Sequence, residues 1–233
     1  MKTTHVIGFV LVVVLVGLLA IGCGKKDGTV ELGWPIGEVV ERQIGDGGFT
    51  KENLAKVESL TLGRTILGKD VNDLTPLESL PNLWMLSLSR QQKIDDFAPL
   101  AKLSKLEQLN LSGCGISDLK PLAGLKNLTQ LQLSQNNIAD LSPLTGLTKL
   151  NHLTLTDNKL TNEQLAHVSK LENLKFLSIG NNPYGANTNR ITSLEPLLGL
   201  KKLDEVILMN IKELPSEEID KLRKALPGCI IRQ

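Results

Sequence analysis

A repeat of 22 residues recurs in the middle of this 233-residue chain and restricts the folds that it can adopt. The segments LEQLNLSGCGISDLKPLAGLKN and LTQLQLSQNNIADLSPLTGLTK follow each other directly from Leu106 and Leu128, and a third copy begins at Leu150. Looser copies begin at Val57, Leu83, Leu174 and Leu203. Self-similarity with a period of roughly 20 to 50 residues indicates structural repeats that stack on their neighbours.

Each repeat contains a short alternation of leucine with polar residues, as in Leu109-Asn110-Leu111. This alternation predicts a β-strand with its leucines on one face. One repeat cannot bury that face alone, so stacked repeats are expected to share a continuous core. Each buried leucine or isoleucine contributes roughly 1.5–3 kcal/mol to such a core. Only 3% of residues are aromatic, which suits a core of identical aliphatic side chains.

The full pattern of the repeat, L-x-x-L-x-L-x-x-N-x-I-x-D-L-x-P-L-x-x-L, resembles the leucine-rich-repeat family in the short variant typical of internalins. The repeat from Leu128 fills every defined position, and the resemblance extends over about residues 35–233. It implies an α/β solenoid, a horseshoe with a parallel concave sheet, short outer turns and helical caps. The family uses the concave face to bind partners, usually proteins.

One phase of the repeat is predicted to form a structural ladder inside the solenoid. Asparagine amides at this phase can bond backbone groups that the bend of each repeat leaves unpaired, because buried backbone polar groups need partners. Cysteine is a common substitute there in the family, whereas Gln91 fits the phase less well. The predicted ladder consists of Cys114, Asn136, Asn158 and Asn182.

The outer side of the solenoid is predicted from proline and helix patterns. The motif Asp-Leu-x-Pro-Leu recurs from Asp73, Asp118 and Asp140, and proline favours a tight irregular turn because it fixes φ. The repeat from Leu150 lacks that motif, and Thr161 is a candidate cap for a short helix there.

The ends of a solenoid need caps that cover its apolar core. Pro35 can open an N-terminal helix, Thr50 can cap a second one, and Ser216 can cap a C-terminal helix before a closing strand from Cys229 to Ile231. The predicted units are a signal peptide (1–22), a tether (23–34), an N-terminal cap (35–56), leucine-rich repeats (57–210) and a C-terminal cap (211–233).

The first residues form an export signal, in which Lys2 precedes an apolar run from Val6 to Ile21 and then Cys23. This arrangement resembles the lipobox of bacterial lipoprotein signal peptides. The resemblance implies cleavage before Cys23 and its acylation, and several acyl chains at roughly 0.8 kcal/mol per buried CH₂ hold a protein durably on a membrane. The alternative is an uncleaved transmembrane anchor, since the run approaches the lower limit of about 17 residues. Both place the solenoid outside the cytoplasm, on the surface or periplasmic face of a bacterial membrane.

The outward positions of the concave strands are the candidate partner-binding residues, with an ordinary solvated sheet face as the alternative. They are Met85, Gln108, Asn110, Gln130, Gln132, His152, Thr154, Phe176 and Ser178. Exposed apolar side chains mark interfaces, which favours Phe176 and Met85. The longest internal insertion adds Tyr184 and Arg190 as possible loop contacts, because insertions in repeats often carry function.

Composition and motifs narrow the class of function. Lys and Arg number 26 against 25 Asp and Glu, without a basic run, so nucleic acid is not an expected partner. His152 and His167 are the only histidines after the signal, and no CxxC, HExxH or phosphate-binding glycine loop is present. We therefore expect no catalytic residues, cofactor or metal.

The sequence favours a membrane-anchored binding module, an adhesion or scaffold protein that holds a protein ligand on its concave strands. Two alternatives remain open. One is a structural envelope protein that binds cell-wall glycan, because the concave positions are polar and poor in aromatic residues. The other is a non-catalytic accessory subunit of an envelope enzyme.

Overall fold

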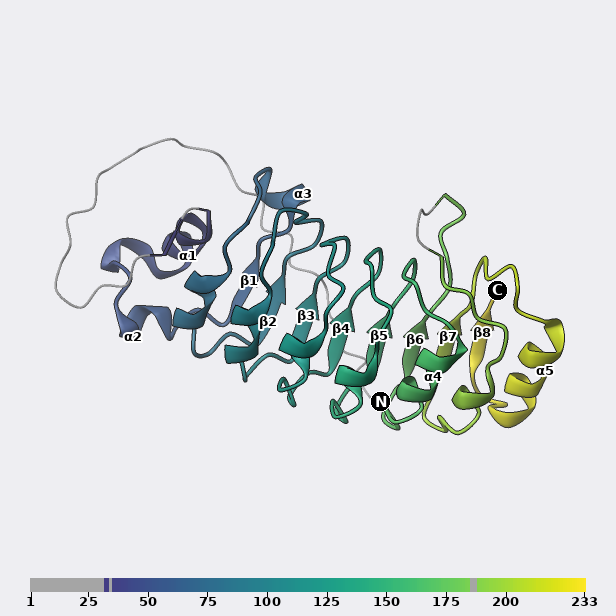
Figure 1. The fold of residues 1–233 in the computed structure, drawn as a ribbon. Helices are drawn as coiled ribbons and strands as arrows, with labels where there is room; N and C mark the ends of the chain where they lie inside the picture. Colours follow the sequence, from purple (N-terminus) through teal and green to yellow (C-terminus); the bar gives the residue numbers. More distant parts are fainter. Residues whose placement is uncertain (1–31, 34, 185–187) are drawn as a thin grey trace, which may run out of the picture.

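The computed structural model describes residues 32–33, 35–184 and 188–233. The predicted signal peptide and Cys23 lie outside these residues, as does most of the tether. The described residues form one sheet of eight parallel strands in chain order, with turns and helices on the opposite side (Figure 1). The strands are β1 (Ser59–Thr61), β2 (Met85–Ser87), β3 (Gln108–Asn110), β4 (Gln130–Gln132), β5 (His152–Thr154), β6 (Phe176–Ser178), β7 (Glu205–Ile207) and β8 (Ile230–Arg232).

The register of the sheet follows the repeat. The central residue of each strand pairs with the central residue of the next, as Leu109 does with Leu131 and Leu131 with Leu153. These central residues are buried while their neighbours on the same strand are half-exposed in β1 to β5. The chain is therefore a leucine-rich-repeat solenoid, as the sequence predicts.

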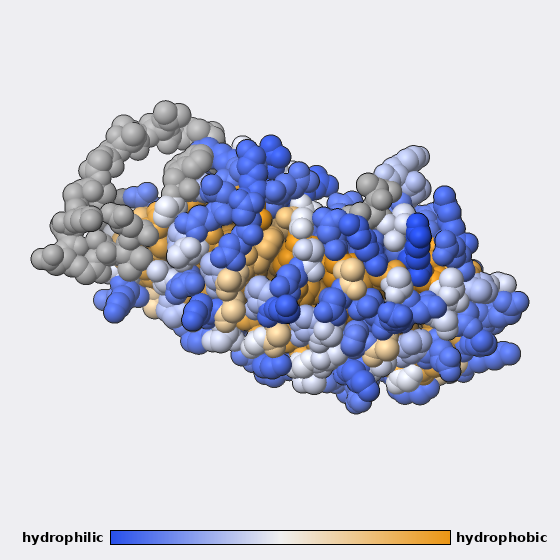
Figure 2. Space-filling view, in the orientation of Figure 1, coloured by the Kyte–Doolittle hydropathy of each residue, from blue (hydrophilic) through white to orange (hydrophobic). Residues whose placement is uncertain are grey.

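A single hydrophobic core runs through the solenoid from Leu32 to Leu226. Nearly every leucine of the repeat motif is less than 5% exposed. Hydrophobic residues show as a band along the molecule, bordered by hydrophilic residues (Figure 2). The stacking of neighbours thus buries what one repeat would leave exposed.

Short 3₁₀ helices form five outer turns, each with a proline near its start, and three of them contain the Asp-Leu-x-Pro-Leu motif. The five helices are η2 (Thr75–Ser79), η3 (Ala98–Lys102), η4 (Lys120–Leu122), η5 (Ser142–Leu144) and η6 (Glu195–Leu197). In the central turns an aspartate Oδ1 accepts a hydrogen bond from the N–H two residues later, from Lys120 to Asp118 at 2.9 Å and from Ser142 to Asp140 at 2.8 Å. The hydrogen bonds in this turn lower the pKa of the Asp140 carboxyl. The largest contribution comes from the bond that the Ser142 backbone N–H donates.

Helices replace or precede the turns at three places. Helix α4 (Asn162–Val168) lies where the proline motif is missing, with Thr161 as its N-cap residue. Helices α1 (Ile36–Ile44) and α2 (Lys51–Leu54), joined by η1 (Gly45–Gly47), cover the start of the core, and Thr50 Oγ1 accepts the Asn53 N–H at 3.2 Å. Helix α3 (Arg64–Leu67) was not expected from the sequence.

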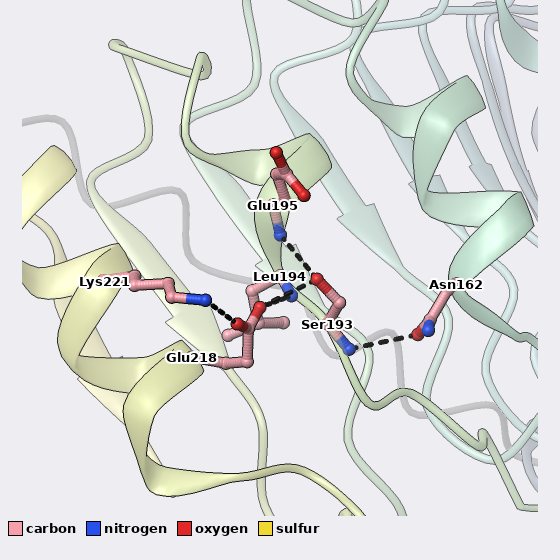
Figure 3. A network of polar contacts seen from close by, with 6 residues as sticks. All are labelled: Asn162, Ser193, Leu194, Glu195, Glu218 and Lys221. Carbon is pink, nitrogen blue, oxygen red and sulfur yellow. Dashed lines mark hydrogen bonds and ion pairs between the residues drawn. The ribbon is translucent and has the colours of Figure 1, made fainter.

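The C-terminal helix α5 (Ser216–Ala225) covers the other end of the core and joins a polar network (Figure 3). Ser216 was predicted as its cap, which is wrong, because Pro215 occupies the cap position and Ser216 is already helical. The Glu218 carboxylate accepts hydrogen bonds from Leu194 N and Ser193 Oγ, both at 2.8 Å, and from Lys221 Nζ at 2.5 Å. These bonds, that of Lys221 foremost, lower the pKa of Glu218 to about 2.

No helix within residues 32–33, 35–184 and 188–233 has both the length and the apolar character needed to cross a membrane.

Candidate partner-binding surface

The ladder residues fix the strands that carry the candidate surface. Asn136 Oδ1 accepts hydrogen bonds from Cys114 N and Ile116 N, and its Nδ2 donates to Leu111 O and Leu133 O. Asn158 repeats the arrangement one turn later, accepting from Ile138 N and donating to Leu133 O and Leu155 O. Each amide thereby ties two neighbouring repeats together at the end of their strands.

Asn182 does not belong to the ladder, so this prediction is wrong. Its side chain is exposed and accepts the Tyr184 N–H at 3.0 Å. The buried Asn189 takes the position, with Nδ2 donating to Leu155 O and Ile179 O at 2.9 Å and Oδ1 accepting from Leu160 N at 3.1 Å. The insertion in this repeat delays the ladder residue by seven positions, which a count of the repeat phase does not reveal.

Cys114 lies at the ladder phase and bonds less fully than an asparagine. Its backbone N–H donates to Asn136, and its Sγ donates to Leu88 O at 3.0 Å. Burial raises the pKa of the thiol to about 11, so it stays protonated and available as a donor. Cys114 and Cys229 are both free thiols.

Gln91 fills the ladder position of an earlier repeat, although the sequence marked it as a weaker fit. It is fully buried, its Nε2 donates to Leu62 O at 2.6 Å, and its Oε1 accepts from Val71 N at 2.8 Å. A glutamine carries the same amide as asparagine on a longer stem. The signal in the sequence that could have identified Gln91 was an amide side chain at the ladder phase of the repeat.

The candidate residues of the concave face form two rows across the strands. The first row contains Met85, Gln108, Gln130, His152 and Phe176, and the second contains Asn110, Gln132, Thr154 and Ser178. All are half-exposed except Ser178, which is buried and shares a 2.7 Å hydrogen bond with Thr156. Because neighbouring strands lie about 4.8 Å apart, each row presents closely spaced side chains to one partner.

The character of the first row changes along the sheet. The His152 and Phe176 rings are stacked, with centroids 4.1 Å apart and planes 4° apart. Burial lowers the pKa of His152 below its ordinary value, with Glu205 acting in the opposite direction, and this shift favours the neutral imidazole. Glu205 forms an ion pair with Arg232 on the next strand. Along the sheet from β3 to β7, two glutamines are thus followed by the stacked aromatic pair and then by the charged Glu205.

The predicted loop contacts differ in their surroundings. Tyr184 is 96% exposed, and Arg190 is exposed while its backbone N–H donates to Leu160 O at 2.8 Å. Both residues belong to the insertion that follows β6. Neither residue belongs to the two concave rows.

The described part of the chain contains no group of three or more His, Cys, Asp or Glu side chains placed to hold a metal ion. His152 is on β5 and His167 is on α4 at the outer side.

Comparison with known proteins agrees with the repeat architecture. Residues 104–146 match the family model described as leucine-rich repeats in two copies. The search of curated proteins found no match to the sequence.

Several solved bacterial structures share the fold. Internalin C2 from Listeria monocytogenes has a TM-score of 0.60 and 27% identity over 76% of this chain and 89% of that one. Internalin F from the same species has a TM-score of 0.61 and 23% identity over 85% and 67%. A leucine-rich-repeat protein from Leptospira interrogans has a TM-score of 0.63 and 25% identity, and the match covers 79% of this chain but only 45% of that one. This chain carries leucine-rich repeats and folds as a solenoid similar to those of internalins.

Proposed function

We propose that this protein is a membrane-anchored binding module that holds a protein partner on the concave face of its solenoid. The observation that carries the proposal is the stacked His152–Phe176 pair, half-exposed beside a row of glutamines. Aromatic residues are enriched at the centres of protein interfaces. Amides beside them can donate to and accept from a partner's backbone.

The rigidity of the sheet supports the same proposal. The strands that carry the two rows, β2 to β6, are held on both sides by parallel neighbours, and Asn136 and Asn158 bond the ends of the central ones. A surface that is ordered before binding loses less conformational entropy when the partner arrives. Repeat proteins typically use such extended faces as non-catalytic interaction surfaces.

Cross-linking in intact cells followed by mass spectrometry tests this assignment. We expect the native protein to capture a partner that is lost when Gln132, His152 and Phe176 are all replaced by alanine. A matched variant on the outer side, with Lys120, Glu163 and Lys170 replaced by alanine, should capture it normally. Equal capture by the native protein and both variants would refute the concave-face assignment.

The cell-wall alternative has its own support in the amide rows of β3 and β4, which also suit sugar hydroxyls. Binding of the purified protein to protein-free wall material, lost in the Gln132, His152 and Phe176 variant, would favour glycan over a protein ligand. Loss of a neighbouring enzyme's activity on deletion would favour an accessory subunit.

The membrane anchor is proposed from the sequence around Cys23 alone, because Cys23 lies outside the residues that the structure describes. Replacing Cys23 with alanine should abolish palmitate incorporation. If the native chain incorporates no palmitate and still sediments with membranes, the uncleaved transmembrane anchor is the correct alternative.

A further inference from the structure

A groove at the rim of the solenoid, where the first three strands begin, takes no part in the proposed concave site. It is lined by Glu58, Asn82, Trp84, Lys105, Glu107 and Asn127 and has a volume of about 700 Å³. Trp84 is 36% exposed, which sets it apart from the buried aliphatic residues of the repeat.

Glu58, Trp84 and Glu107 form a row because each immediately precedes a strand. The Trp84 N–H donates to Glu58 O at 2.9 Å, and the Glu107 N–H donates to Trp84 O at 2.8 Å. Their backbones are therefore adjacent in the same ladder, with a spacing of about 4.8 Å between strands. The row places one carboxylate on each side of the indole.

The other polar side chains that line the groove already form hydrogen bonds with neighbouring residues of the rim. Lys105 Nζ donates to Asn82 Oδ1 at 2.6 Å, and Asn82 Nδ2 donates to Ala55 O at 2.7 Å. Asn127 likewise donates to Ser104 O and accepts from Lys149.

The two carboxylates differ from these amides. Neither Glu58 nor Glu107 makes a side-chain hydrogen bond or ion pair within the part of the chain that the structure describes. Two carboxylates without a side-chain partner therefore flank an exposed indole, while the ammonium groups of Lys105 and Lys149 are each bonded to an asparagine of the groove.

We propose that this groove binds a lysine or arginine side chain of a protein partner, with the cation over Trp84 and between Glu58 and Glu107. Tryptophan is the aromatic residue that attracts cations most strongly, through the negative face of its ring. The flanking carboxylates add charge attraction, which is weakened by salt at an exposed site. The groove lies beside the concave rows, so its assignment stands even if those rows are inert.

Tryptophan emission gives a direct test, because the chain has two tryptophans and replacing Trp34 with phenylalanine leaves Trp84 as the sole reporter. The full-length protein in nonionic detergent is titrated with a hexalysine peptide. We expect a saturable change in Trp84 emission that weakens as salt rises. The double variant Glu58→Gln and Glu107→Gln should bind the peptide at least tenfold more weakly.

A matched control uses Asp204, an exposed carboxylate at the same rim position before β7, where its N–H donates to Lys175 O. Asp204→Asn should change the affinity less than twofold, and circular dichroism should show that both variants are folded. Unchanged hexalysine binding by the double variant, or no saturable emission change, would overturn the proposal. Tighter binding of chitohexaose or hexaglutamate than of hexalysine would also overturn it, and would identify the groove as a sugar or anion site.

Discussion

The central repeats and the repeat that begins at Leu174 satisfy corresponding backbone groups with residues from different places in the chain. In the central repeats, Asn136 and Asp140 come from the repeat whose turns they hold. In the repeat that begins at Leu174, the ladder residue is Asn189, which follows an insertion. In its outer turn Ser193 Oγ takes the place of the aspartate and accepts the Glu195 N–H at 3.3 Å. Glu218 from helix α5 accepts the neighbouring Leu194 N–H (Figure 3), whose counterpart Leu141 N–H is accepted by Gln164.

Several details explain how the irregular repeat keeps the geometry. Asn181 holds Asn189 in place, accepting its N–H at 2.7 Å and donating to its carbonyl at 3.0 Å. On the outer side Ser193 lies where the central turns have aspartate, and its N–H donates to Asn162 Oδ1 at 3.1 Å. The backbone groups that lack a backbone partner determine where a polar side chain is needed. That side chain can come from several positions in the sequence.

The largest expected effect is the loss of a ladder amide in the regular region. Asn136→Ala removes the partners of four buried backbone groups. Since each unsatisfied buried group costs about 1–3 kcal/mol and water can partly replace the amide, we expect the free energy of unfolding to fall by about 3 kcal/mol. Urea denaturation of the full chain measures it. Gln132→Ala, on the half-exposed concave face, is the control, and an equal loss in both variants would contradict the ladder's role.

The same substitution in the irregular region should have a smaller effect. Asn189→Ala removes the acceptor of the Leu160 N–H and the donor to three buried carbonyls beside an insertion, those of Leu155, Ile179 and Gly180. We expect a loss of about 2 kcal/mol, because the neighbouring backbone can relax more easily there. Asn182→Ala, at the nominal phase but exposed, should change stability by less than about 0.5 kcal/mol. If Asn182→Ala were the more harmful change, the assignment of the ladder to Asn189 would be wrong.

Regular features of the molecule were predictable because they repeat. The leucine phase predicts the strands and core, and the asparagine phase identifies Asn136 and Asn158. Asn189 escaped because an insertion breaks the count, and the importance of Gln91 escaped because its reach depends on the local path of the backbone. The Trp84 groove is formed by three separate repeats, so no single repeat contains its pattern. The position of a residue within the repeat predicts its role in that repeat. Sites that are formed between repeats require the three-dimensional structure.

The smallest expected effect concerns Glu218, the carboxylate that the cap supplies to the irregular repeat. Glu218→Gln keeps the shape of the side chain but removes its charge-assisted bond to Lys221. At pH 7 we expect a loss of about 1 kcal/mol, which lowers Tm by about 2–4 °C for a protein of this size. Glu217→Gln, in the same first turn of α5, should leave Tm unchanged.

The pH dependence of this difference follows from the direction of the pKa shift. The pKa of Glu218 falls from an ordinary value of 4.5 to about 2 in the folded protein. The unfolded chain therefore binds more protons between these values, and the stabilisation is complete above about pH 4.5 and is lost as pH falls toward 2. Thermal melts of the native protein and Glu218→Gln should converge over this window. A Tm difference that stays constant down to pH 2 would show that Glu218 acts through its shape and not its charge, and that the cap does not hold the irregular turn electrostatically.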